Sequence, residues 1–210
     1  MHEFFVLPVS PLQENCFILC CKETKEAAII DAGDEADRIM TLIEAKGYKA
    51  KLLINTHCHV DHVSAVAAIQ ERLDLPFLAH PKEKPILDSL LMGQQFYGFG
   101  DGRIPTVTGA LDPAETVKMG NLSIEVIETP GHTPGGVCLK VGDDLFTGDT
   151  LFAFSIGRTD LPGGNTNQLM ESIKNKLLCL PPQTRVHPGH GPSSSIGVEA
   201  EGNPFLQGLV

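Results

Sequence analysis

The segment at residues 56–62 constrains this chain more than any other stretch; its sequence is THCHVDH. Three histidines and an aspartate, all potential metal ligands, follow directly after the strand-like run at 51–54. Imidazole nitrogen and carboxylate oxygen suit zinc, iron or manganese. In an extended turn His57 and His59 lie on the same side, whereas Asp61 and His62 face a second point once the chain coils. The spacing therefore predicts a buried strand that ends in a turn binding two metal ions.

Composition limits the class of protein. The 210 residues, 42% of them hydrophobic and 20% charged, are enough for one domain with a substantial core, and we expect residues 1–210 to form a single domain. The formal net charge of −10, without a run of basic residues, disfavours nucleic acid or an anionic membrane as a partner. The N-terminus lacks the basic start of a signal peptide, and no segment approaches the ~20 apolar residues of a membrane span.

These features predict a cytoplasmic protein, either a monomer or a homodimer. The six cysteines form no CxxC pair and are expected to be free, buried thiols. Cys58 lies between two candidate ligands, and we expect its side chain to point away from the metals and into the core.

Hydrophobic periodicity predicts strands alternating with helices, hence an α/β sandwich. Residues 93–113 and 155–165 are expected to be loops because they are rich in glycine and polar residues. The expected strands are 2–7, 16–21, 26–31, 51–54, 76–79, 136–141, 144–147 and 184–186, with a hairpin over 114–128. The expected helices are 34–46, 63–72, one that begins near Pro81, and 165–180.

Three later stretches repeat one pattern, an apolar strand followed by a glycine-rich turn with one potential ligand. The ligands are His132 in TPGHTPGG, Asp149 in FTGD and His190 in PGHGP. Glycine permits positive φ and a close approach of the backbone to a metal. Together with the segment at 56–62, these turns supply five histidines and two aspartates.

In this order, the HxHxDH segment and the Gly-His, Gly-Asp and Gly-His turns resemble the metallo-β-lactamase superfamily. Within it the chain is similar to the glyoxalase II (hydroxyacylglutathione hydrolase) group, through residues 129–133, 146–152 and 180–186. The resemblance spans roughly residues 10–195. It implies a four-layer αββα sandwich with the metals at one edge.

The resemblance also implies a ligand set and a reaction. One ion would be held by His57, His59 and His132, the other by Asp61, His62 and His190, with Asp149 bridging them. Two divalent ions, either zinc or iron and manganese mixtures, would activate a bridging hydroxide and polarise a carbonyl. The implied reaction is hydrolysis of a thioester such as S-lactoylglutathione to a hydroxy acid and a thiol, with Asp61 and Asp149 as catalytic residues. A thiolate leaves without a strong general acid, because the thiol has a pKa of about 8.5.

Two departures from the glyoxalase II pattern bear on the substrate. That group carries a C-terminal helical domain that helps to hold glutathione, whereas only about 20 residues follow His190 here. Its tyrosine-bearing loop is replaced by residues 155–164. The chain therefore looks like the short, single-domain glyoxalase II-like hydrolases, and we expect a small acyl-thiol substrate whose thiol is not fixed as glutathione.

Other reactions on this scaffold stay open. Persulfide dioxygenases also resemble the chain, including its GRTD stretch at 157–160, and use one Fe(II); His57, His132 and Asp149 would form the facial triad. Lactone hydrolysis also stays open, because esters and thioesters are attacked alike. The negative charge disfavours RNA processing. Thiolate-ligated β-lactamases are excluded, because no cysteine lies at a ligand position.

Several residues outside the ligand set have two interpretations each. Arg158 would contact a substrate carboxylate or form a structural salt bridge to Asp160 or another carboxylate. Asp31 would hydrogen-bond a metal-bound histidine or only shape its turn. The aromatic loop at 93–102 would line the substrate cleft or cover the core. His80 and His187 are expected to be structural histidines.

Overall fold

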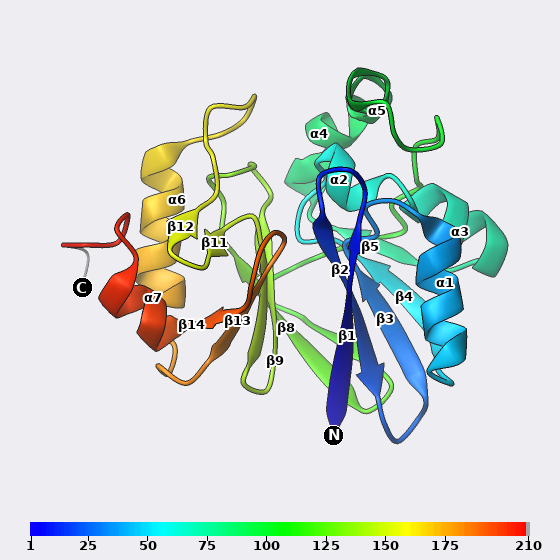
Figure 1. Cartoon of the computed structure of the whole chain (residues 1–210), viewed down its shortest axis with the longest axis horizontal. Helices are drawn as coiled ribbons and strands as arrows, with labels where there is room; N and C mark the ends of the chain where they lie inside the picture. The colour runs from blue at the N-terminus through cyan, green and yellow to red at the C-terminus, as the bar shows by residue number, and fades with distance from the viewer. Residues whose placement is uncertain (209–210) are drawn as a thin grey trace.

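Two six-stranded sheets pack face to face, and helices cover their outer faces (Figure 1). The strand order is β1-β2-β3-β4-β5-β6 in the first sheet and β14-β13-β10-β9-β8-β7 in the second. The computed structural model describes residues 1–208. The architecture is the four-layer αββα sandwich that the sequence predicts.

The first sheet is antiparallel at β1, β2 and β3 and parallel from β3 to β6. Its strands are β1 (His2–Val9), β2 (Glu14–Cys21), β3 (Glu26–Ile30), β4 (Lys49–Ile54), β5 (Phe77–Ala79) and β6 (Gly109–Ala110). Its helices are α1 (Ala36–Ala45), α2 (Val60–Val63), α3 (Val66–Leu73), η1 (Pro81–Glu83), α4 (Lys84–Asp88) and α5 (Leu90–Tyr97). Parallel strands end at the same edge of a sheet, so the segments after β3 and β4 emerge together.

The second sheet mixes antiparallel pairs with the parallel pair β10 and β13. Its strands are β7 (Thr116–Met119), β8 (Leu122–Glu128), β9 (Val137–Val141), β10 (Asp144–Gly148), β13 (Arg185–Pro188) and β14 (Ser194–Ser195), and a small ribbon pairs β11 (Leu151–Phe152) with β12 (Ser155–Ile156). The outer layer contains α6 (Thr166–Ser172), the π-helical turn η2 (Ile173–Leu177) and α7 (Ile196–Gly202). Because β10 and β13 are parallel, the segments that follow them also emerge at one edge.

Strand β2 shows why the chain forms layers. All eight of its residues are buried, and alternate side chains enter different cores. Ile18 faces the helices, whereas Phe17 packs between the sheets. There the Phe17 ring lies 5.0 Å from that of Phe146 of the second sheet, in an edge arrangement.

The predicted loop at 93–113 is partly wrong. Helix α5 continues to Tyr97 and ends at Gly98, whose φ of 73° closes the helix, and β6 adds a short strand later in this stretch. Gly93 fits the helix because it packs against α2, where an added Cβ would lie 3.2 Å from Val60. The predicted loop at 155–165 begins with β12, and the predicted helix 165–180 changes to π-helical geometry at Ile173.

All six cysteines are free, and five are buried as predicted. Cys179 is the exception, because it lies exposed after η2, at the outer surface. Cys58 belongs to the core between the first sheet and its helices, so its side chain points away from the neighbouring histidines as expected. Within residues 1–208, no helix has the length and apolar character needed to cross a membrane.

Candidate metal centre

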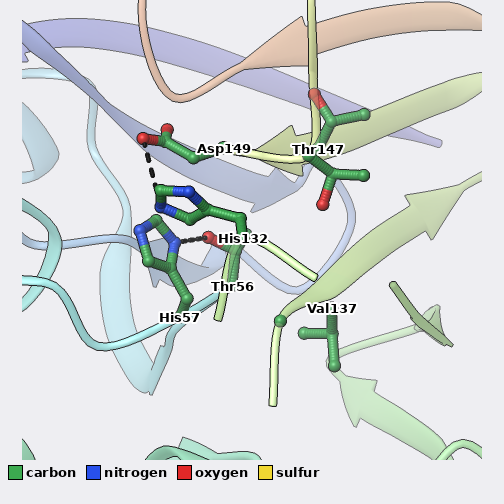
Figure 2. A pocket seen from close by; sticks show the side chains of 8 residues that line it. Thr56, His57, His132, Val137, Thr147 and Asp149 are labelled. Carbon is green, nitrogen blue, oxygen red and sulfur yellow. Dashed lines mark hydrogen bonds and ion pairs between the residues drawn. The ribbon is translucent and has the colours of Figure 1, made fainter. Parts of the chain in front are cut away.

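The seven predicted ligands lie on four segments that meet at one edge of the sandwich. Residues 57–62 follow β4 and begin α2, and His132 lies between β8 and β9. Asp149 follows β10 directly, and His190 comes two residues after β13. Figure 2 shows His57, His132 and Asp149 facing one another, with Thr56 beside His57. The four segments meet at this edge because the strands that precede them in both sheets end there.

One group of side chains consists of His57, His59 and His132, whose ligand atoms all lie within 4.8 Å of one another. His59 Nδ1 is 2.9 Å from His132 Nε2. His132 Nδ1 donates to the backbone oxygen of Arg158 at 2.7 Å, which leaves Nε2 without a hydrogen and directed at the group. His57 Nδ1 lies 3.1 Å from the Thr56 hydroxyl, so its Nε2 is likewise free to bind.

A second group consists of Asp61, His62 and His190, again with ligand atoms within 4.8 Å of one another. His190 Nε2 lies 3.1 Å from Asp61 Oδ2. His62 Nδ1 donates to Asp31 Oδ2 at 3.0 Å, so Nε2 is the atom that faces this group. Asp31 also lies near His57 and His62, but its oxygens already accept hydrogen bonds from Thr56 and His62.

The Asp149 carboxylate lies between the two groups. Its Oδ1 is 3.4 Å from His62 Nε2 in the second group. Its Oδ2 is 3.6 Å from His132 Nε2 in the first group and 3.9 Å from His190 Nε2 in the second. This is the arrangement that a carboxylate shared by two cations requires.

Burial and neighbouring charges keep the histidines and aspartates in different protonation states. Burial, together with the neighbouring imidazoles, lowers the pKa of His57 well below its ordinary value and that of His59 to about 4. Burial also disfavours charge on His62, but Asp149 and Asp61 raise its pKa well above the ordinary value. Although burial opposes ionisation of Asp149, the His62 imidazole holds its pKa well below the usual range. Neutral imidazole and ionised carboxylate are the forms that bind metals, so His57, His59 and Asp149 are in the required form, whereas His62 would release a proton when a metal binds.

Unpartnered buried atoms test whether these residues fit a metal. Within residues 1–208, eight buried side-chain atoms lack a hydrogen-bond partner, and three of them belong to predicted ligands: His57 Nε2, His62 Nε2 and Asp149 Oδ1. Buried polar atoms are normally paired, because an unpaired one costs about 1–3 kcal/mol. All three belong to the same cluster of histidines and carboxylates, so the site fits divalent cations.

Position 189 requires glycine because the backbone there passes close to the side chains of both groups. A Cβ there would lie 2.5 Å from Asp149 Oδ1 and 2.6 Å from His62 Cε1. The PGHG turn therefore lets the chain pass directly over the two groups and brings His190 to the second one.

The other predicted site residues have clear positions. Arg158 forms a bidentate salt bridge to Asp160, with both bonds at 2.7 Å and the guanidinium exposed, while its backbone oxygen accepts the His132 hydrogen bond. A substrate contact for Arg158 stays a prediction. Asp31 hydrogen-bonds to His62, one of the predicted ligands, and a role in orienting a metal-bound histidine stays a prediction.

The two histidines predicted to be structural have protein partners outside the ligand set. His80 Nε2 lies 2.9 Å from Glu128, and its Nδ1 accepts the backbone N–H of Lys82 at the start of η1. His187 Nε2 donates to Asp144 at 2.8 Å. The aromatic segment forms the end of α5, where Phe96 is 82% exposed.

Sequence reasoning missed three polar residues at the site. Thr56 donates its hydroxyl hydrogen to Asp31 at 2.6 Å, which links Asp31 to His57. The Glu14 carboxyl is fully buried 3.8 Å from His62 Nδ1, and burial raises its pKa well above the usual range. Glu83 accepts backbone hydrogen bonds from two of the ligand segments. Thr56 stands next to His57 in the motif and could have been recognised there, whereas nothing local marks Glu14 and Glu83, because their partners are distant along the chain.

Known proteins share both the sequence pattern and the fold. The sequence model of the metallo-beta-lactamase superfamily matches residues 9–190. The chain is 36% identical over 212 residues to the probable metallo-hydrolase YqgX of Bacillus subtilis, covering 97% of each protein. It is 35% identical over 210 residues to the hydroxyacylglutathione hydrolase GloC of Haemophilus influenzae, covering 96% of each.

Three crystal structures show the same architecture. The B3 metallo-beta-lactamase BLEG-1 is 38% identical with a TM-score of 0.88, covering 98% of this chain and 100% of that one. TTHA1623 in a di-iron-bound form is 38% identical with a TM-score of 0.86, covering 96% and 100%. ETHE1 from Myxococcus xanthus is 28% identical with a TM-score of 0.82, covering 96% and 83%.

The fold and the paired histidine and carboxylate groups define a protein of the metallo-hydrolase class. The chain belongs to the metallo-β-lactamase superfamily. Its similarity to GloC supports the glyoxalase II-like resemblance predicted from the sequence.

Proposed function

We propose that the protein hydrolyses thioesters of small hydroxy acids, such as S-lactoylglutathione, with two divalent metal ions. The observation that carries the proposal is the convergence of seven potential ligands on two groups, with Asp149 between them and buried nitrogen and oxygen atoms that lack protein partners. His57, His59 and His132 would hold one ion; Asp61, His62 and His190 would hold the other. Such a pair of ions supplies an activated water and polarises the carbonyl of the substrate.

The side chains of this centre have distinct roles in the proposed reaction. Asp149 orients both metal groups, because its two oxygens face different histidines. Asp61 helps to neutralise the second group and holds His190 through the 3.1 Å contact. The hydrogen bonds from His62 to Asp31 and from His132 to the Arg158 carbonyl fix which imidazole nitrogen binds.

Thioesters are the preferred substrate class for two reasons. A thiolate leaves without protonation, and no further carboxyl or amine is needed inside the ligand motifs to act as a general acid. The relative GloC, similar over 96% of both chains, is a hydroxyacylglutathione hydrolase. The acyl-thiol would enter from the edge at which the ligand segments emerge.

The test combines metal content with a substrate panel. Untagged protein is analysed for zinc, iron and manganese. Thiol release is followed with S-lactoylglutathione and a second acyl-thiol, and ring opening is followed with a lactone and a β-lactam. The β-lactam is included because BLEG-1, a B3 metallo-beta-lactamase, is similar in structure. About two metal equivalents and the highest kcat/KM on an acyl-thiol are expected; metal-loaded protein that releases no thiol from any acyl-thiol would refute the proposal.

Persulfide oxidation at a single iron is the second candidate. It is favoured because His57, His132 and Asp149 lie close together (Figure 2). Asp149 Oδ2 is 3.6 Å from His132 Nε2. Two imidazoles and one carboxylate form the facial triad of non-haem iron oxygenases. About one iron per chain with oxygen uptake dependent on glutathione persulfide would favour this reaction over hydrolysis, whereas iron-loaded protein without oxygen uptake would exclude it.

A further inference from the structure

Glu83 is a buried carboxylate outside the ligand set. It lies at the end of η1 and is only 1% exposed. Its Oε2 accepts the backbone N–H of Cys58 at 2.8 Å, and its Oε1 accepts the backbone N–H of Gly135, also at 2.8 Å. Both carboxylate oxygens are therefore committed to backbone donors.

The two donors belong to the two segments that carry the first metal group. Cys58 stands between His57 and His59, on the turn that follows β4 of the first sheet. Gly135 lies three residues after His132, in the turn between β8 and β9 of the second sheet. Glu83 thus joins the two sheets at the point where the three imidazoles of these two segments meet.

The Cys58 turn packs against the core of the first sheet on one side and borders a pocket on the other. A cavity of about 570 Å³ lies beside it, lined by Cys58 and Glu83 together with Leu87 of α4 and Ile104. Side chains next to a cavity have fewer partners to keep them in place than those in a close-packed core. Hydrogen bonds to an ionised acceptor are stronger than neutral ones, so a carboxylate that spans both turns adds to the packing that fixes them.

We propose that Glu83 is a positioning residue that sets the distance between the His57–His59 turn and the His132 turn, and so controls metal affinity at the three-histidine group. The inference rests on the ligand set of the proposed function. It is tested through metal binding alone, so it can fail while thioester hydrolysis stands.

The experiment measures Co²⁺ binding by the full chain, by visible absorption and by competition with a chelating dye. Glu83→Gln keeps the size of the side chain, but the amide nitrogen is a donor and cannot accept a hydrogen bond. One of the two backbone N–H groups therefore loses its acceptor. Glu199→Gln is the matched control, because Glu199 is also fully buried and accepts a backbone bond, from Phe154 at 2.8 Å. Urea unfolding of both variants reports the purely structural loss.

We expect Glu83→Gln to weaken one Co²⁺ equivalent by about 10–100-fold, the usual effect of losing a group that orients metal ligands, and to leave the other unchanged. In a His190→Ala background, which leaves the three-histidine group intact, the remaining equivalent should show the same weakening. Glu199→Gln should bind both equivalents like the parent protein even where its unfolding midpoint falls equally.

Other outcomes of the Co²⁺ experiment would contradict the proposals. Glu83→Gln with parental affinity for both equivalents, or a uniform loss shared with Glu199→Gln, overturns the positioning role. A parent protein that binds no Co²⁺ instead refutes the metal centre of the proposed function. If Glu83→Gln does not fold, Glu83→Asp serves the same comparison, because its carboxylate is one methylene short of spanning both turns.

Discussion

Asp31 Oδ2 lies 3.0 Å from His62 Nδ1, with both side chains buried at the end of the first sheet. The same carboxylate accepts the Thr56 backbone N–H at 2.7 Å and its hydroxyl hydrogen at 2.6 Å. Since the Thr56 hydroxyl is also 3.1 Å from His57 Nδ1, one carboxylate orients a histidine in each candidate metal group. Asp31 therefore links the two groups through its hydrogen bonds.

The first prediction concerns this carboxylate. Asp31→Asn should weaken metal binding by about 10–100-fold, because an amide no longer fixes the tautomer of His62 as a carboxylate does. It should also lower the free energy of unfolding by about 1–3 kcal/mol, since buried donors lose their acceptor. Chelator competition and urea unfolding measure the two effects separately.

Asp144→Asn is the control for that comparison. Asp144 is as buried as Asp31 but stands at the opposite end of β10 from Asp149. This control should lose stability and keep the metal. Equal metal loss in both variants would mean that Asp31 acts only through stability.

The candidate ligands were readable from the sequence because they lie in short segments at strand ends, where the chain itself brings them close. Strand direction then places the segments of His57 and His190 at one edge. A role for Asp31 could be predicted for the same reason, as it follows a buried strand. The fold was predictable because β2 is apolar on both faces, as expected for a strand whose alternate side chains enter two different cores.

Other features depend on tertiary contacts that no local pattern encodes. Glu83 binds backbone N–H groups 25 and 52 residues away, and any residue type except proline can supply such donors. Helix α5 extends through glycine-rich sequence because Gly93 packs closely on Val60. Glu14 begins β2 and is buried beside His62, and an acidic residue in a strand gives no sign of this.

The second prediction concerns Gly189. Gly189→Ala should abolish binding of at least one metal equivalent, because the added Cβ would lie 2.5 Å from Asp149 Oδ1 and 2.6 Å from the His62 ring. Gly191→Ala is the control, since it has a φ of 78° but no atom within 4 Å of an added Cβ. Elemental analysis after dialysis distinguishes the two variants, and full metal content in Gly189→Ala would contradict the close approach.

The third prediction is that the protein loses stability on acidification through Asp144. Burial opposes its ionisation, but hydrogen bonds from Arg185, His2 and His187 hold its pKa well below the usual range. Burial also lowers the pKa of His187. Both side chains bind fewer protons in the folded protein than in the unfolded chain, so their contribution to stability is complete at neutral pH and is lost as the pH falls. The contribution of His187 falls below pH ~6.5, and that of Asp144 falls below pH ~4.

Urea unfolding from pH 7.5 to pH 3 measures this dependence. Asp144→Asn should be less stable at neutral pH by about 2 kcal/mol, as expected for lost hydrogen bonds to a charged group, and its stability should change less below pH 4. Parallel curves for the variant and the parent protein would show that Asp144 does not carry the acid sensitivity.

The last prediction separates the two interpretations of Arg158. Its guanidinium is exposed and paired with Asp160, while its backbone oxygen holds His132 Nδ1 at 2.7 Å. Because that backbone contact survives substitution, Arg158→Ala should keep its full metal content. If the guanidinium binds substrate, KM for S-lactoylglutathione should rise about tenfold, the value of one ionic hydrogen bond, with kcat nearly unchanged. An uncharged acyl-thiol should show no such rise. Asp160→Asn, which frees the guanidinium, should leave KM unchanged or lower it, whereas a rise matching that of Arg158→Ala would assign Arg158 to the structural salt bridge alone.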